Sequence, residues 1–169
     1  DSYTIPEGVT SIADYAFYYC DGIKRISIPA YVTSIGYEAF YYCDGITEAY
    51  IDSCVIGASA FVNCDYLKDL TLGDNVTEIG NDAFNSCDAI TEVTIPESVT
   101  KISGYAFSYC RGLKEVYCKS TTPATITSSY VFYDNASGRK IYVPVEAVEA
   151  YKSANYWKDY ASSIVGYDF

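Results

Sequence analysis

The chain has 169 residues, of which 50% are hydrophobic and 20% are charged, and its net charge is -11. This length and apolar content suit one folded domain and exclude a disordered chain. The acidic excess argues against a nucleic-acid-binding surface, which needs clustered Lys and Arg, and against binding that depends on an anionic membrane. Histidine is absent, which removes the commonest general base and the usual zinc ligand.

The chain begins inside a repeated pattern. Its residues Thr4-Ile5-Pro6 recur as Thr94-Ile95-Pro96, at the end of a predicted strand. A strand at residues 3–5 would leave an unpaired edge, so we expect self-association through this N-terminal edge. We also expect that a longer protein precedes this segment and that a secretion signal has been removed. No apolar run approaches the roughly 20 residues needed to span a bilayer.

One motif then recurs five times. Each copy reads Ala-Phe-x-x-Cys followed by spaced apolar residues, and the copies begin at Ala16, Ala39, Ala60, Ala83 and Ala106. The Phe positions are 17, 40, 61, 84 and 107, so the steps are 23, 21, 23 and 23 residues. A period in the twenties predicts coils stacked in a line, in which each coil buries its apolar side against its neighbours.

Two periods of apolar residues define one coil. The spacing of Ile23, Ile26 and Ile28 predicts a half-buried strand that pairs with its equivalents in a parallel sheet. A turn with Pro, Gly, Asp or Asn follows, and then a second short apolar pair such as Val32 and Ile35. The Ala-Phe-x-x-Cys segment is expected to place Phe and Cys on one side of a single helical or 3₁₀ turn.

We expect two parts in the chain. Residues 1–143 should form the solenoid, with about five regular coils and one irregular coil, in which Phe132 is the nearest match to the repeated Phe. Residues 144–169 should form a C-terminal cap, because a solenoid needs its terminal apolar core covered. The predicted cap begins with a helix after Pro144 and uses the apolar side chains Val145, Val148, Tyr151, Trp157 and Ile164. A functional helix is the alternative.

Cysteine occupies one position in all five copies: Cys20, Cys43, Cys64, Cys87 and Cys110. We predict reduced, buried thiols that pack beside the Phe column. Disulfides within the column are disfavoured because equivalent side chains of stacked coils point the same way, whereas Cys54 and Cys118 lie outside it. The sequence has no Cys-x-x-Cys pair or His that would complete a metal site or lower the pKa of a thiol. We therefore assign no metal and no cofactor.

An acidic residue follows the Cys in four copies, and Arg111 takes its place in the fifth; the four are Asp21, Asp44, Asp65 and Asp88. A column of carboxylates is one way to bind calcium. Asp before Gly is also ordinary turn chemistry, since its side chain accepts bonds from local backbone N–H groups. Arg111 favours the turn interpretation.

The strand residues that point away from the core form the candidate ligand-binding face. Its residues are Glu48, Tyr50, Asp69, Thr71, Glu92, Thr94, Glu115, Tyr117 and Tyr142. Stacked strands make a broad, rigid array, and Tyr contributes contact area with little side-chain entropy to lose. The alternative is a solvated sheet face, on which Thr and Tyr are simply good strand formers and the charges maintain solubility.

Tyrosines also crowd the turns around the Phe column: Tyr15, Tyr18, Tyr19, Tyr37, Tyr41, Tyr42, Tyr105 and Tyr109. A partly exposed aromatic patch marks a contact site in some proteins. In a repeat array it is equally explained by duplication of one coil, and we favour that explanation.

The consensus VTxIGxxAFxxCxxLxxIxIP resembles the BspA-like leucine-rich repeats of bacterial surface proteins. The segment from Ile141 to Tyr160 looks like the C-terminal end of members from gut Bacteroidetes and Firmicutes. The resemblance implies an α/β repeat solenoid with right-handed coils, one parallel β-sheet and short helical or 3₁₀ turns on the other side. It also implies an extracellular or cell-surface location.

The implied function is non-enzymatic adhesion to a protein ligand, such as a host extracellular matrix component or a cell-surface protein. No catalytic residues are assigned, because no acid–base pair, phosphate-binding loop or cofactor motif is present. Two alternatives remain. The coils can be a structural spacer in a larger surface protein, or a carbohydrate-binding module that uses Tyr50, Tyr117 and Tyr142 as platforms.

Overall fold

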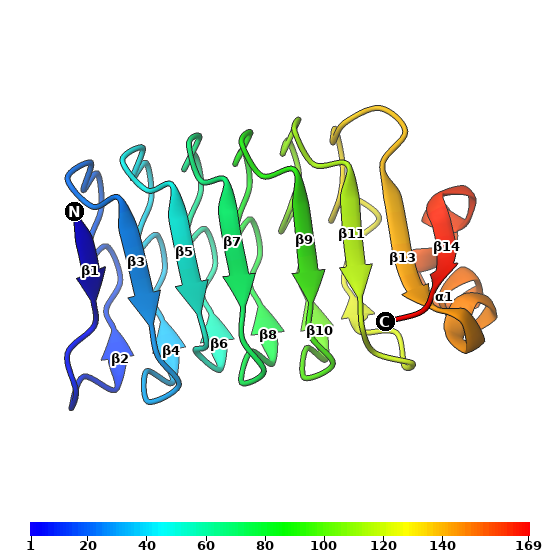
Figure 1. The fold of residues 1–169 in the computed structure, drawn as a ribbon, viewed down its shortest axis with the longest axis horizontal. Helices are drawn as coiled ribbons and strands as arrows, with labels where there is room; N and C mark the ends of the chain where they lie inside the picture. The colour runs from blue at the N-terminus through cyan, green and yellow to red at the C-terminus, as the bar shows by residue number, and fades with distance from the viewer.

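The computed structural model describes residues 1–169, which form a parallel β-solenoid (Figure 1). Each of the first six coils contributes a longer strand to one face and a two-residue strand to the opposite face, and a seventh longer strand follows them. The longer strands are β1 (Ser2–Thr4), β3 (Arg25–Ile28), β5 (Glu48–Ile51), β7 (Asp69–Leu72), β9 (Glu92–Ile95), β11 (Glu115–Cys118) and β13 (Lys140–Pro144). The short strands are β2 (Ser11–Ile12), β4 (Ser34–Ile35), β6 (Val55–Ile56), β8 (Glu78–Ile79), β10 (Lys101–Ile102) and β12 (Thr125–Ile126).

Equivalent residues of successive coils pair with one another. Ile26 pairs with Ala49, and Ala49 pairs with Leu70, so one side of each longer strand always faces the core. The short strands form a second, six-stranded parallel sheet in the order β12-β10-β8-β6-β4-β2. The expected fold class, a leucine-rich repeat solenoid, is confirmed. The strand character of the second apolar pair was not expected.

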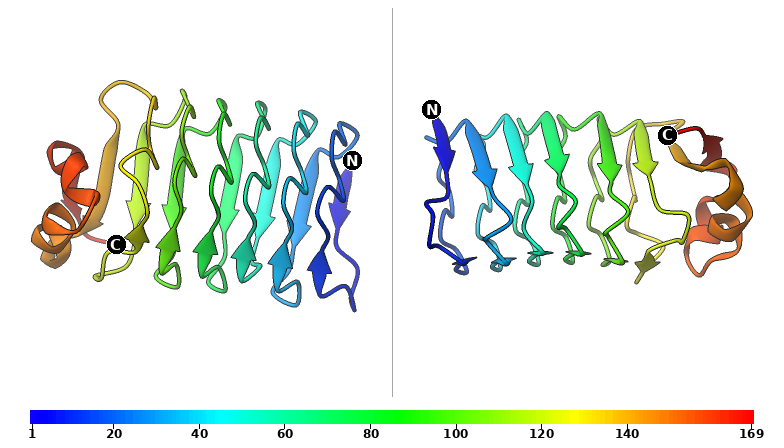
Figure 2. Two further views of the ribbon diagram at one scale, coloured as in Figure 1. Left: turned by 180° about the vertical axis from the view of Figure 1, so that it is seen from behind. Right: turned by 60° about the horizontal axis from the view of Figure 1, so that its bottom comes forward.

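The row of longer strands is interrupted between β7 and β9. These strands are neighbours, but no backbone ladder joins them, so β1, β3, β5 and β7 form one sheet and β9, β11, β13 and β14 another (Figures 1 and 2). At the ends of β7 and β11, Gly73 and Lys119 each donate a backbone bond to the preceding coil. Pro96, which follows β9, has no N–H to donate. We call this interruption the seam; β8 and β10 remain paired behind it.

A column of stacked phenylalanines fills the centre of the solenoid. The ring centroids of Phe17, Phe40, Phe61, Phe84, Phe107 and Phe132 are separated by 4.8, 4.7, 5.4, 5.2 and 5.8 Å in that order. Phe132 therefore occupies the repeated position in the irregular coil, as the sequence suggested. All except Phe17 are buried, because Phe17 belongs to the first coil and has a neighbour on only one side.

The Ala-Phe-x-x-Cys segments differ from the expected helical or 3₁₀ turns. They are non-helical turns in which the backbone N–H of Phe17 donates to Ala39 of the next coil at 2.7 Å, and that of Phe40 donates to Ala60 at 2.7 Å. A helix would need these N–H groups for its own carbonyls. Two residues per turn also have positive φ, for example Tyr15 at 60° and Tyr19 at 56°.

After β13 the chain forms η1 (Val145–Ala147), α1 (Val148–Ser153), η2 (Trp157–Ser163) and β14 (Ile164–Tyr167). Tyr151 and Trp157 are buried, and they donate side-chain bonds to the Ser120 and Ala124 carbonyls at 3.0 and 2.7 Å. Val145, which we expected on the same apolar face, is 56% exposed. Strand β14, which pairs with β13, was not predicted. None of the helices has the length and hydropathy of a membrane span.

Candidate functional site

The strand face carries the outward side chains of the longer strands. Because side chains alternate along a strand, Glu48 lies beside Asp69, and Tyr50 beside Thr71, in paired registers. Beyond the seam, Glu92 pairs with Glu115, and Thr94 with Tyr117. The nine residues that the sequence singled out therefore fall into two groups, one on each sheet, and Asp69 and Thr71 face Glu92 and Thr94 across the seam.

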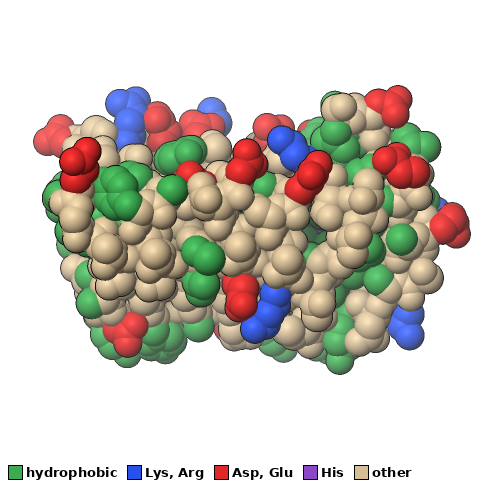
Figure 3. Space-filling view, turned by 90° about the horizontal axis from the view of Figure 1, so that it is seen from below, with side chains coloured by type: hydrophobic (Ala, Val, Ile, Leu, Met, Phe, Trp, Pro, Cys, Tyr) green, Lys and Arg blue, Asp and Glu red, His purple; other side chains and the backbone are tan.

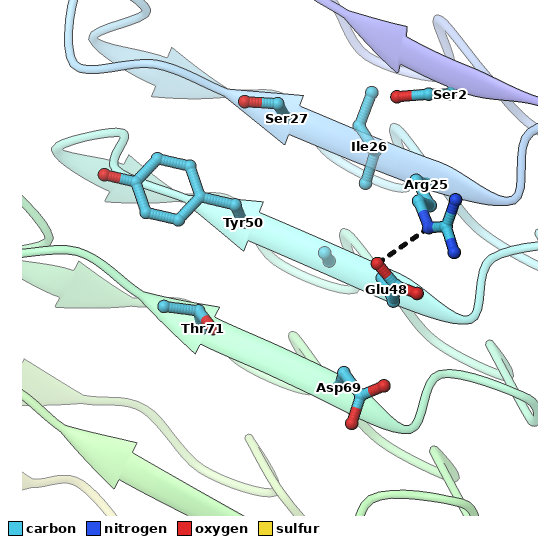
Figure 4. A pocket seen from close by; sticks show the side chains of 9 residues that line it. Ser2, Arg25, Ile26, Ser27, Glu48, Tyr50, Asp69 and Thr71 are labelled. Atoms are coloured by element: carbon cyan, nitrogen blue, oxygen red, sulfur yellow. Dashed lines mark ion pairs between the residues drawn. The ribbon is translucent and has the colours of Figure 1, made fainter.

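The first group borders an open groove of about 260 Å³ on β1, β3, β5 and β7 (Figure 4). Arg25 Nε lies 2.8 Å from Glu48 Oε2, with 62% and 43% of the two side chains exposed. The pair is well solvated, so it contributes little to stability and its groups remain accessible. The Asp69 carboxylate has no basic partner in the structure. The groove thus contains the ion-paired guanidinium of Arg25 and the Asp69 carboxylate, which has no basic partner.

Tyr50 is the one aromatic side chain of this groove and is 43% exposed. Its ring stands clear of the strand, beside Thr71 (Figure 4). Partial desolvation, and then the Asp52 carboxylate, raise the pKa of Tyr50. The phenol therefore remains protonated at neutral pH and can donate a hydrogen bond to a ligand.

In the second group Glu92 and Thr94 are exposed, but the two tyrosines belong to an aromatic cluster rather than to an open surface. Tyr117 stacks on Tyr142 with 4.8 Å between ring centroids, and Tyr167 packs edge-on against both rings at 5.5 Å. Phe169 adds a further edge contact to Tyr167 at 5.0 Å. The Tyr117 hydroxyl donates to Glu115 Oε2 at 2.9 Å. Desolvation, and then this bond, raise the pKa of Tyr117 to about 12.

Sequence reasoning missed Tyr167, the last residue of β14, and Phe169, which follows this strand; both lie outside every repeat. The chain end returns across the strand face, so that the C-terminus lies near β11 (Figure 1). No periodic signal could have indicated this contact. As a result the exposed faces of Tyr117 and Tyr142 are partly covered, and Tyr50 is the more open aromatic side chain.

The repeated cysteines are core residues that also donate hydrogen bonds. All seven cysteines are unpaired. The thiols of Cys43, Cys64, Cys87 and Cys110 lie 2.9, 3.2, 3.1 and 3.0 Å from the Phe carbonyl of the preceding coil. In the irregular coil, Asn135 Nδ2 donates to the Phe107 carbonyl at 2.7 Å instead. No group of three or more metal-ligating side chains is assembled.

The aspartates after the cysteines join successive coils. Asp21 Oδ1 accepts the Asp44 N–H at 3.2 Å, and Asp88 Oδ1 accepts the Arg111 N–H at 3.0 Å. The Arg111 guanidinium also lies 3.3 Å from Asp88 Oδ2 and 3.6 Å from Asp134 Oδ2. These bonds differ from the local ones that the turn interpretation expected, because each accepted N–H belongs to the following coil.

The repeat, its period and the repeated cysteines match a known family. A profile of the BspA type leucine rich repeat region matches residues 1–114 and 52–159, in six copies. The chain belongs to the BspA-type leucine-rich repeat family. No curated protein matches it significantly.

Three solved structures illustrate the similarity of this BspA-type chain to bacterial proteins. A leucine-rich repeat protein from Bacteroides ovatus aligns with 99% of the chain at 23% identity and a TM-score of 0.78. The T. pallidum leucine-rich repeat protein aligns with 69% at 31% identity and a TM-score of 0.64. The pneumococcal vaccine antigen PcpA aligns with 98% at 21% identity and a TM-score of 0.70. The chain spans only 42%, 57% and 39% of these proteins, respectively.

Proposed function

We propose that this chain is a non-enzymatic interaction module of a bacterial surface or secreted protein, and that it binds a protein ligand on the face of β1, β3, β5 and β7. The open groove around Tyr50 is the observation that carries this proposal. It combines an exposed aromatic ring, an unpaired carboxylate at Asp69 and a solvated Arg25–Glu48 pair on a rigid sheet. Such a mixture of one rigid aromatic and several adaptable polar groups suits a protein ligand.

Charge supports a ligand with a basic contact surface. The chain has 22 acidic and 11 basic residues, and acidic side chains also outnumber basic ones on the lower edge of the solenoid, which Figure 3 shows. An extracellular matrix component or a cell-surface protein of the host is the class of ligand we favour. The resemblance in architecture to PcpA, described as a vaccine antigen, supports a surface location.

A carbohydrate ligand is less well supported. Sugar rings need an open aromatic face, but Tyr117 and Tyr142 stack on each other and contact Tyr167 edge-on. Tyr50 alone remains as a platform. A spacer role would leave the whole face without a ligand.

The test is a binding screen of the purified chain against immobilised matrix proteins and a glycan array, followed by surface plasmon resonance on any hit. The double variant Tyr50→Thr/Asp69→Asn introduces at position 50 the residue that β7 and β9 carry at Thr71 and Thr94. We expect it to weaken protein binding at least about tenfold. Lys101→Gln, which alters the opposite sheet, is the control and should bind normally.

Each other outcome selects an alternative. No hit in either panel would favour the spacer. A protein hit that the double variant retains would contradict binding at this groove and place the ligand elsewhere on the chain. A glycan hit that is lost with Tyr50→Thr and kept with Asp69→Asn would establish the carbohydrate module.

We also propose that the isolated chain self-associates through its first coil. The edge of β1 is unpaired, and an apolar groove of about 230 Å³ beside it is lined by residues such as Ile5, Val9 and Phe17. A second copy would satisfy these backbone groups and cover the groove. Light scattering should show a mass that rises with concentration, and Val9→Glu should abolish the rise. A constant monomer mass would refute this.

A further inference from the structure

A second surface stands out on the turns of the first two coils, away from the groove. It consists of six tyrosines, here called the tyrosine patch: Tyr15, Tyr18, Tyr19, Tyr37, Tyr41 and Tyr42. Tyr18 stacks on Tyr41 at 5.2 Å, and Tyr19 on Tyr42 at 5.1 Å, with ring planes within 4° and 3° of parallel. Tyr15, Tyr18, Tyr19 and Tyr37 are between 40% and 55% exposed. The rings are therefore ordered against one another and open to solvent.

The charges within this surface are all of one sign. Residues 13–23 and 36–46 contain Asp14, Asp21, Glu38 and Asp44 and no Lys or Arg. None of these four carboxylates takes part in an ion pair. Glu38 is half-buried at the centre, where it accepts a bond from the Tyr37 hydroxyl and raises the pKa of Tyr37 to about 12. The patch thus holds four carboxylates that have no cationic partner, although Asp14, Asp21 and Asp44 each accept a backbone N–H bond through Oδ1.

Several tyrosines of the patch have a backbone conformation that is unfavourable for tyrosine. Tyr19 and Tyr42 have φ of 56° and 53°, a left-handed conformation that bulky residues adopt unfavourably. Asn63 and Ser86 occupy the same position in the next two coils, with φ of 56° and 61°. Asn is the better residue for this conformation, so simple duplication does not require tyrosine here.

The fifth coil shows how a guanidinium sits on these turns. Arg111 stands at the position of Asp21 and Asp44, and its guanidinium bridges Asp88 and Asp134 at 3.3 and 3.6 Å. Arg111 follows Tyr109 by two residues in the sequence. The first two coils have similar tyrosines and carboxylates but lack this arginine.

We propose that the tyrosine patch and its four carboxylates form a second binding surface, which takes an arginine-bearing basic segment of a partner protein. A planar guanidinium carries five donors for carboxylate and phenol oxygens, and it stacks on aromatic rings where a lysine ammonium makes only a point contact. A sugar is a poorer ligand, because the faces that Tyr18 and Tyr41 turn to each other are already stacked.

The test uses two synthetic probes, an eight-residue peptide of alternating Arg and Gly and its Lys counterpart, titrated by isothermal calorimetry. The variant Tyr18→Asn/Tyr19→Asn/Tyr41→Asn/Tyr42→Asn should keep the fold, since Asn63 and Asn85 occupy these positions in other coils. We expect the Arg peptide to bind the native chain, and to bind this variant at least about tenfold more weakly. Glu38→Gln should also weaken binding, and added salt should do so for every form.

The control is Lys101→Gln, which lies outside both surfaces and should bind the Arg peptide like the native chain. A loss of binding in the groove variant Tyr50→Thr/Asp69→Asn would place the peptide in the groove and overturn the second surface. Equal binding of the Lys and Arg peptides, or full binding by the four-Asn variant, would also overturn the proposal. Circular dichroism of each variant establishes that the fold is intact.

Discussion

Ser53 is fully buried, and its hydroxyl has no hydrogen-bond partner. In the flanking coils the same position holds Val32 and Val76, both fully buried. An unsatisfied buried hydroxyl costs about 1–3 kcal/mol, and valine would replace it with apolar volume. Ser53→Val should therefore raise the free energy of unfolding by about 1–2 kcal/mol, as measured by urea denaturation.

The control is Ser108, which is equally buried but donates its hydroxyl to the Tyr130 carbonyl. Ser108→Ala should lower stability, because it removes a satisfied bond. If Ser53→Val unfolds at a lower urea concentration than the native chain, the third coil has no room for a valine side chain at position 53.

Asp65 lies between Asp44 and Asp88 in the column of turn aspartates. Desolvation, and then these two carboxylates, raise its pKa above the ordinary value of 3.8, although Arg111 lowers it in part. A raised pKa in the folded state means that protonation favours folding. The contribution is fully present below pH 3.8 and is lost as the pH rises through the raised pKa. Asp65→Asn should therefore be more stable than the native chain at pH 7, with the gain vanishing below pH 3.8.

Thermal unfolding from pH 3 to pH 8 checks this dependence. Asp88→Asn provides the contrast, because Asp88 accepts the Arg111 N–H and pairs with its guanidinium. That variant should lose stability at pH 7. A constant difference between Asp65→Asn and the native chain at all pH values would contradict the electrostatic explanation.

At the scale of the element, each thiol is held by its own coil and its neighbour. Cys43, Cys64, Cys87, Cys110 and Cys118 are buried, whereas Cys20 and Cys54 are half-buried. Burial raises the pKa of the Cys43, Cys110 and Cys118 thiols to about 12, and that of Cys64 and Cys87 well above the ordinary value. Since the thiolate is the nucleophile, the buried five should not react at pH 8.

Titration with a thiol reagent measures this directly. In the native chain only Cys20 and Cys54 should react quickly, and in urea all seven should react. Rapid reaction of five or more thiols in the native chain would show that the coils open locally on the timescale of the assay.

The strands and the core of the coils could be predicted from the sequence, whereas the structure of the turns and of the last strand could not. The strands and the Phe column were predictable because each copy carries the same apolar spacing, and even Phe132 could be aligned. The turns were expected to be helical because one copy alone does not show that the Phe17 N–H donates to Ala39 of the next coil. Strand β14 could not be predicted, since it belongs to no repeat and forms only by pairing with β13.

The candidate face was predictable as a set of outward residues, but not its division into an open and a covered part. That division depends on two non-periodic features. The seam separates the groups, and Tyr167 and Phe169 pack on the second. Pro96 did not indicate the seam, because Pro29 has the same place in its coil without interrupting the sheet. There the Tyr31 hydroxyl donates to the Ile5 carbonyl that the missing N–H would otherwise bond.

At the scale of the whole molecule, the seam leaves a backbone amide at its edge less protected from exchange with solvent than the equivalent amides of either sheet. Lys68 and Lys114 donate backbone N–H bonds to Thr47 and Thr91 of the preceding coils, but the Thr91 N–H makes no such bond. All four residues are exposed. The Thr91 amide should therefore exchange with deuterium much faster than those of Lys68 and Lys114, as measured by NMR. Equal protection at the three amides would mean that the sheet is continuous in solution.

The coils that carry β7 and β9 are linked by the β8–β10 ladder, by turn bonds such as that of the Phe84 N–H to Ala106 and by the Phe84–Phe107 stack, but by no ladder on the strand face. We expect bending of the solenoid to concentrate at this seam, because a change of angle between the two groups of longer strands breaks no strand ladder there. The curvature of the strand face would then vary mainly between Asp69 and Glu92. A ligand confined to the groove would leave the angle between the two sheets free to vary. A ligand that contacts both sheets would fix this angle and would lose part of its affinity to that ordering. Protection gained at the Thr91 amide on binding would distinguish the two.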